Sequence, residues 1–251
     1  MMKKLLVWGI AVSMLVGYSG CTDDPPEDPT EPRTTEVSID FHHFVDGALV
    51  DMDTIKYINA NGDTFSIRTI KYFISRVTFH RDGKDDVVLS DKHYVEEGLD
   101  ETKSYVFESK IPDGTYTGIS FTYGFINADN ISYMFPNAPE YQMFWPENMG
   151  GGYHYQKIEG QYLEDGIKKF FNFHAGGLDK VDYSINMVLP NSAFQVQDNA
   201  VKIDLTMEIQ NWFKTPEVWD FAYYGAAIMG NHEAQTTIQK NGTDVFTCTV
   251  N

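Results

Sequence analysis

Apolar and polar residues alternate along several segments of the chain, a pattern typical of β-strands that bury one face. The clearest case is segment 201–209, in which every second residue is apolar and the residues between them are polar or charged. Segments 38–44 and 115–125 alternate in a similar way. In segment 115–125 the predicted buried face consists of Thr117, Ile119, Phe121, Tyr123 and Phe125.

Pairs of Asp or Asn followed by Gly separate these segments and predict tight turns, because both residues tolerate a positive φ. The pairs occupy positions 46–47, 61–62, 82–83, 113–114, 165–166 and 241–242. Two short helices are expected late in the chain. One would begin with Thr215 as N-cap and Pro216 in the first turn, and the other would cover 231–240 and end at Asn241-Gly242.

The long segment from residue 37 to residue 251 contains no linker-like stretch and no repeat of fixed period. Its length is ordinary for one β-sandwich or barrel. The sequence therefore predicts an all-β fold, a single antiparallel β-sandwich over residues 37–251 with short helical additions.

The N-terminal residues have the composition of a signal for export. Lys3 and Lys4 precede an apolar run over 5–16, which is shorter than the ~20 residues of a transmembrane helix, and the sequence YSGC ends at Cys21. We interpret residues 1–20 as a lipoprotein signal peptide and Cys21 as the lipidated N-terminus; an ordinary signal peptide cut nearby is the alternative.

Residues 21–36 are rich in Asp, Glu and Pro and predict an extended tether. We expect a lipid anchor in the outer membrane with the domain at the cell surface, and a periplasm-facing domain as the alternative. The formal net charge of −17 argues against nucleic acid and anionic membrane surfaces as partners, so the N-terminal lipid would be the only membrane contact. With Cys21 acylated, Cys248 has no disulfide partner within the chain.

Common catalytic motifs are absent from the sequence, which contains no GxSxG, P-loop, HExxH or strand-following GxGxxG. The glycines at 150–152 lack the Lys-Ser/Thr pair of a phosphate-binding loop. No Asp/Glu spacing singles out an acid–base pair. We therefore expect a non-catalytic protein.

Three histidines are the candidate ligand-binding residues. His154 follows a run of glycines, His174 precedes Gly176 and Gly177, and alternation places His43 on an apolar strand face. If they converge, neutral imidazole rings could bind copper or zinc. Such binding would weaken as pH falls through the imidazole range, near ~6.5 for an unperturbed ring. Buried histidines that bond to the backbone are the alternative.

Other polar residues have supporting or structural interpretations. Asn172 shares a strand face with His174 and could fix the second nitrogen of a liganding ring. His80 and His93 flank predicted turns and are expected to be solvated, and His232 is expected near the start of the second helix.

Five segments, in this order, resemble the MbnP-like domain family. They are SIDFHHFVDGALV, TIKYFISRVTFHRDG, IPDGTYTGISFTYGF, MFWPENMGGGYHYQKIEG and FNFHAGG, within residues 37–177. Members are secreted or lipid-anchored β-proteins, and some are associated with copper. Some have a di-haem partner enzyme that oxidises a tryptophan to kynurenine, which then binds copper. The resemblance therefore implies copper binding and a secreted di-haem partner.

The resemblance also singles out individual residues. His43 matches the histidine of the family's first strand, His174 matches the histidine of its F-H-x-G-G stretch, and Trp145 matches the first tryptophan of a W-x-W pair. The second tryptophan of that pair is replaced by Glu147, and the chain contains no W-x-H sequence. The kynurenine ligand of some relatives therefore has no obvious counterpart here.

Two functions from different classes follow from the sequence. The first is a non-catalytic surface lipoprotein that binds copper, or zinc as the alternative, through His43, His174 and His154. The second is a binding or adhesion lipoprotein, for example for glycans, with structural histidines. Its platform would consist of Trp145, Tyr153, Tyr155, Trp219, Tyr223 and Tyr224.

Overall fold

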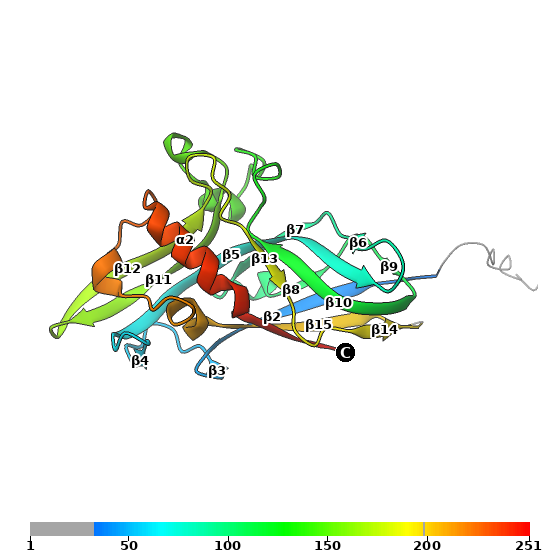
Figure 1. Cartoon of the computed structure of the whole chain (residues 1–251), viewed down its shortest axis with the longest axis horizontal. Coiled ribbons are helices and arrows are strands. Elements are labelled where there is room, and N and C mark those ends of the chain that lie inside the picture. Colours follow the sequence, from blue (N-terminus) through cyan, green and yellow to red (C-terminus); the bar gives the residue numbers. More distant parts are fainter. Residues whose placement is uncertain (1–32, 198) are drawn as a thin grey trace, which may run out of the picture. The chain divides into compact units, whose positions relative to one another are not determined.

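The computed structural model describes residues 33–197 and 199–251, which form two β-sheets packed face to face and a short separate ladder (Figure 1). The large sheet contains β4 (Tyr57–Ile58), β5 (Thr64–Arg81), β6 (Val87–Val88), β7 (Lys92–Glu96), β10 (Gly114–Tyr123), β11 (His154–Glu164), β12 (Ile167–Gly176), β13 (Ile185–Val188) and β14 (Phe194–Val196). The small sheet contains β2 (Val37–Val45), β3 (Ala48–Leu49), β8 (Ser104–Val106), β15 (Val201–Glu208) and β16 (Phe246–Val250). The predicted all-β sandwich is confirmed.

Strand order places β5 at the centre of the large sheet. The order is β12-β11-β5-β10-β13, and β4, β6 and β7 also pair with β5. The small sheet has the order β16-β15-β2-β3, and its β15–β2 pair is parallel. Its other strand pairs are antiparallel, and the parallel pair could not be foreseen, because alternation reveals which face of a strand is buried and not the direction of its neighbour.

The ladder consists of β1 (Thr34–Thr35) and β9 (Ile111–Pro112), which pair antiparallel. Strand β1 thus lies within the last residues of the segment expected to be a tether. The predicted signal peptide, Cys21 and the other residues up to 32 lie outside the described residues.

Helices are short, and the two α-helices lie late in the chain, as expected. They are η1 (Asp100–Thr102), η2 (Glu140–Met143), η3 (Glu147–Met149), η4 (Ile209–Phe213), α1 (Phe221–Tyr224), α2 (His232–Asn241) and η5 (Gly242–Asp244). The prediction of a helix over 231–240 is confirmed by α2. Within the part of the chain that the structure describes, no helix is long and apolar enough to cross a membrane.

The helix expected to begin at Thr215 is not present. Glu217 donates its N–H to Asn241 Oδ1 at 3.0 Å instead of bonding within a first helical turn. The short helix α1 begins further along the chain, where the Asp220 carboxylate accepts hydrogen bonds from the N–H groups of Ala222 and Tyr223. The capping residue is therefore Asp220, a stronger N-cap type than Thr.

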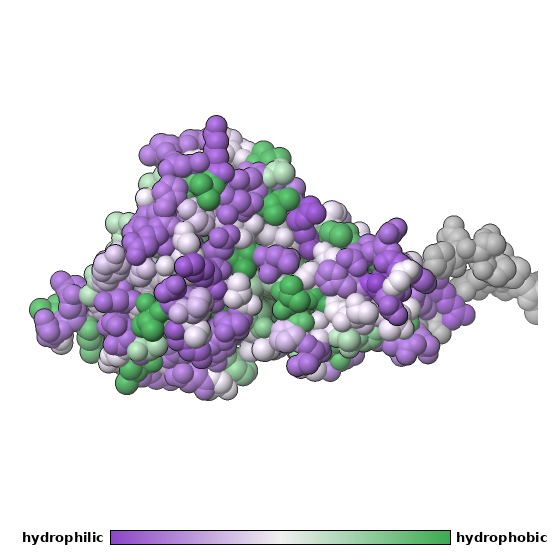
Figure 2. Space-filling model, viewed as in Figure 1, coloured by the Kyte–Doolittle hydropathy of each residue, from purple (hydrophilic) through white to green (hydrophobic). Residues whose placement is uncertain are grey.

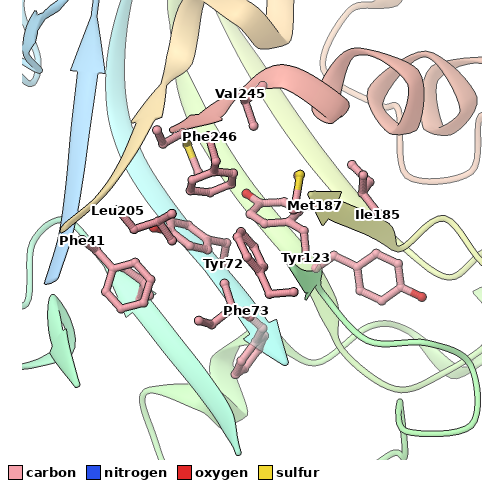
Figure 3. Close-up of a cluster of buried hydrophobic side chains, with 14 of the residues drawn as sticks. Phe41, Tyr72, Phe73, Tyr123, Ile185, Met187, Leu205, Val245 and Phe246 are labelled. Carbon is pink, nitrogen blue, oxygen red and sulfur yellow. The ribbon is translucent and has the colours of Figure 1, made fainter. Parts of the chain in front are cut away.

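The main core lies between the two sheets (Figure 3). Tyr72 of β5 and Tyr123 of β10 stack with ring centroids 5.3 Å apart, and both contact Phe246 of β16 in the opposing sheet. We call the face of the large sheet that carries Tyr72 its inner face and the opposite face its outer face. The alternating residues of segment 201–209 point into this core as predicted.

A second apolar cluster covers part of the outer face. Phe73 of β5 stacks on Phe135 at 5.2 Å and contacts Tyr153 at 6.2 Å. Both partners come from the long connection between β10 and β11, residues 124–153, which includes η2 and η3. This connection is the part of the fold that covers the outer face next to the candidate site.

One strand departs from the expected alternation. Thr117 is exposed, and Tyr116 is buried in its place, because the pairing of β10 with β5 shifts register between Tyr116 and Gly118. Such a bulge moves the residues on one side of it to the other face. The other four residues predicted on that face are buried.

Candidate metal centre

His154 and His174 lie next to each other on the outer face of the large sheet. Their ring centroids are 5.1 Å apart and their planes are nearly perpendicular, at 85°. They come from the neighbouring strands β11 and β12, which pair His154 with Gly176 and Gln156 with Ala175. Tyr155 is the extra residue of a bulge, and the bulge places His154 on the same face as His174.

The His154 ring is buried and held by one hydrogen bond. Its Nδ1 lies 2.9 Å from the carbonyl oxygen of Met143, which can only accept, so Nδ1 carries the proton. Burial, followed by the positive charge of Lys157, lowers the pKa of His154 to about 2. The ring is therefore neutral, and Nε2 carries a lone pair. Among the described residues, this buried Nε2 has no hydrogen-bond partner.

The His174 ring is held by a carboxylate on its Nε2, whereas the His154 ring is held by a backbone carbonyl on its Nδ1. His174 Nε2 lies 2.8 Å from Oε1 of Glu159, and the second carboxylate oxygen of Glu159 accepts a hydrogen bond from Thr69 at 3.1 Å. The hydrogen bond from His174 lowers the pKa of Glu159, so the carboxylate is ionised and Nε2 is the donor. The other nitrogen, Nδ1, is buried and has no partner within the described residues.

Two buried nitrogens without a partner on neighbouring rings are unusual, because buried polar atoms nearly always have a hydrogen-bond partner. In neutral rings with these proton positions, both nitrogens are lone-pair donors. Histidines that bind metals commonly donate their other N–H to a carboxylate or a backbone carbonyl, and His174 and His154 do so here. The donor set therefore fits a metal ion held by two imidazole nitrogens.

The number of donors limits which metals fit. Within the described ranges, no three His, Cys, Asp or Glu side chains come together as a metal-binding group. Structural zinc sites almost always have four ligands, whereas Cu(I), a d¹⁰ ion with affinity for imidazole, accepts two.

Trp145 packs beside the histidine pair. It is fully buried, meets the His154 ring edge to face at 4.7 Å, and donates from Nε1 to the carbonyl oxygen of Met149 at 3.3 Å. A Cβ on Gly176 would lie only 2.5 Å from Cε3 of the Trp145 ring. Gly176 is therefore needed for the indole to reach the site, as expected where glycine allows close approach.

Helix α2 fixes the backbone of β12 at the site. The Gln235 side chain donates to the carbonyl oxygen of His174 at 2.9 Å and accepts from the N–H of Gly176 at 3.2 Å. Its amide thus continues the hydrogen-bond ladder at the edge of β12, and Gln235 is fully buried. Neither Gln235 nor Glu159 was identified from the sequence, because only strand register and helix docking bring them to the histidines.

His43 lies elsewhere, so the expected convergence of His43 with His174 is not observed. It belongs to β2 of the small sheet and points at the inner face, where its Nε2 accepts from the Tyr72 hydroxyl at 3.0 Å. Its Nδ1 lies 2.5 Å from the carboxylate of Glu97. The large sheet therefore separates His43 from the histidine pair. The sequence could not show this, because alternation within one strand does not reveal to which sheet the strand belongs.

Asn172 and the remaining histidines with predicted roles lie in different surroundings. Asn172 donates to the carbonyl oxygen of Ala226 at 3.3 Å, and the role expected of it beside His174 is filled by Glu159. His93 is half-buried, because it is stacked between Phe41 and Tyr105. His80 is more accessible and bonds to Asp86 at 2.8 Å, and His232 is the first residue of α2.

The aromatic residues of the alternative ligand platform are mostly in the core. Trp145, Tyr153, Tyr155 and Trp219 are buried, and only Tyr223 is well exposed, at 67 %. Hydrophobic residues are scattered among hydrophilic ones on the face shown in Figure 2. The predicted platform is therefore not present as an accessible surface.

Acid should destabilise the fold over a defined pH range. Burial lowers the pKa of His43, His93 and His154 below the usual value of 6.5, so the unfolded chain binds more protons than the folded one. Their stabilising contribution is complete above ~6.5 and is lost as pH falls toward the folded-state pKa values. Each ring contributes up to ~1.4 kcal/mol per pH unit.

Urea unfolding of metal-free protein at pH 7.5, 6.0 and 5.0 tests this expectation, and His154→Gln should reduce the slope. An unfolding free energy that stays constant from pH 7.5 to 5.0 would contradict it.

Comparison with known proteins identifies the fold and the family. A model of the MbnP family matches residues 34–230. Among solved structures, MbnP from Methylosinus trichosporium is similar with a TM-score of 0.51 and 14 % sequence identity, covering 74 % of this chain and 80 % of that chain. A search of curated proteins gave no match. The family match extends over most of the chain and over both site histidines, and the chain therefore belongs to the MbnP family.

Proposed function

We propose that this protein is a non-catalytic lipoprotein that binds copper, or a related soft metal ion, through His154 Nε2 and His174 Nδ1. One observation carries the proposal: on two neighbouring rings, a buried nitrogen has no hydrogen-bond partner among the described residues, although each ring is fixed by a partner on its other nitrogen. A buried acceptor that lacks a partner costs about 1–3 kcal/mol, so a bound ion would stabilise this arrangement.

The chain's own residues would hold and orient the ion. Met143 and Glu159 fix the two rings in the orientation that presents their lone pairs, and Trp145 excludes water from one side of His154. The bound ion would be held by two neutral donors, for storage or transfer without turnover. Zinc is the alternative ion, and it would need ligands beyond this pair.

Metal analysis of protein purified without a His-tag tests the proposal. We expect about one equivalent of copper after exposure to copper under reducing conditions, and release of the metal by a strong chelator. Protein that retains no copper, zinc or other soft ion would exclude the proposed function.

The proposal includes an anchor in the outer membrane at Cys21, with the domain at the cell surface. The residues that support it are the Lys3-Lys4 pair, the apolar run at 5–16 and the sequence YSGC. Labelled palmitate should enter the wild-type protein and be absent from Cys21→Ala. Equal labelling of the two proteins would show that Cys21 is not the acylated residue.

A secreted di-haem partner also stays a proposal, supported by the family resemblance alone. Trp145 is the tryptophan in contact with His154 and would be its candidate target, although it is fully buried.

A further inference from the structure

Lys157 is a charged side chain beside the histidine pair that the proposed function leaves unexplained. It lies directly opposite His174 in the pairing of β11 with β12, so the two side chains share the outer face. Its ammonium donates to the carbonyl oxygen of Gln142 at 2.8 Å. The next carbonyl along the chain, that of Met143, accepts from His154. The lysine and the His154 ring are thus held by consecutive residues at η2.

The charges around the two nitrogens nearly cancel before an ion binds. Glu159 contributes one negative charge behind His174, and Lys157 contributes one positive charge. Lys71, opposite Lys157 on β5, is paired with Glu96 at 3.0 Å and adds no net charge. A monovalent ion would leave this half-buried environment with one positive charge, and a divalent ion would leave it with two.

Repulsion from Lys157 depends on the charge of the ion. Coulomb energy is proportional to that charge, and it is weakly screened where water is excluded. A site designed for divalent ions would be expected to place a further carboxylate at this position, because carboxylates are common ligands of such ions. The chain places an ammonium there instead.

We propose that Lys157 makes this site selective for monovalent soft ions of the Cu(I) and Ag(I) class over divalent ions. The inference rests on the proposed function, because it concerns the same histidine pair. Lys157 contacts no ion itself and acts through its charge.

The test compares Ag(I), a monovalent ion without redox chemistry, with Zn(II) in chelator-competition titrations of the full chain. Lys157→Met should raise the affinity for Ag(I) by about tenfold and the affinity for Zn(II) by about a hundredfold, since the repulsion doubles with the charge. Lys157→Gln should give the same result and retains a donor for Gln142. Lys71→Met, on the same face and one strand away, is the control and should change the ratio of the two affinities much less.

Equal gains for the two ions, or no gain for Zn(II), in both Lys157 variants would overturn the selectivity role while leaving the histidine site intact. Wild-type protein that binds neither ion would instead overturn the proposed function, and the selectivity role with it. Only Lys157 and Lys71 variants whose circular dichroism matches that of the wild type are compared with it, so that a change of fold is not mistaken for an effect of charge.

Discussion

Replacing His154 or His174 by alanine is expected to lower the affinity for Cu(I) by more than about 100-fold. Each substitution removes one of two nitrogen donors, a larger loss than the 10- to 100-fold that follows removal of an outer-shell partner. Competition with a coloured Cu(I) chelator measures the affinities of the two variants and the wild type.

His80→Ala is the matched control for these variants, because His80 is more accessible and bonds to Asp86 away from the pair. It should bind Cu(I) like the wild type. His43→Ala should also retain the affinity, although it lowers stability, because it leaves the Tyr72 hydroxyl without its partner and leaves Glu97 with Lys103 alone. If His80→Ala weakens binding as much as His154→Ala does, the assigned ligands are wrong.

Replacing Gly160 by alanine should cause the largest loss of stability expected from a single added methyl group. A Cβ at Gly160 would fall on the backbone carbonyl oxygen of Ser66 in β5, and it would lie 2.7 Å from the Phe171 ring. Neither can move without separating β11 from its neighbours, so we expect a loss of about 3 kcal/mol or more. Denaturant unfolding at pH 7.5 measures it.

Gly98→Ala is the control for Gly160→Ala. A Cβ at Gly98 meets only the Glu96 side chain, at 3.9 Å, so its effect should be within about 0.5 kcal/mol. Similar stabilities of the two variants would mean that β11 and β5 are less closely packed at Gly160 than described.

The fold could be predicted from the sequence wherever strands are regular. Segment 201–209 has no bulge in its pairing with β2, and alternation gave its buried face correctly. Segment 115–125 contains a bulge, and the prediction failed for Thr117. Alternation counts residues, so one extra residue reverses every assignment on one side of it.

The candidate site was only partly predictable for the same reason. His154 and His174 were identified as residues, but their proximity depends on the bulge at Tyr155 and on the register of β11 with β12. Glu159 looks like an ordinary polar residue of an alternating strand until that register is known. His43 was grouped with them because alternation correctly placed it on the buried face of its strand. Alternation could not show that this strand belongs to the other sheet.

The position of a bound ion tests the central claim most directly. Crystals of the protein loaded with copper under reducing conditions and measured at the copper absorption edge should show one anomalous peak. The peak should lie about 2 Å from both His154 Nε2 and His174 Nδ1. A sole peak beside His43, His80 or any other residue, with the histidine pair empty, would contradict the account.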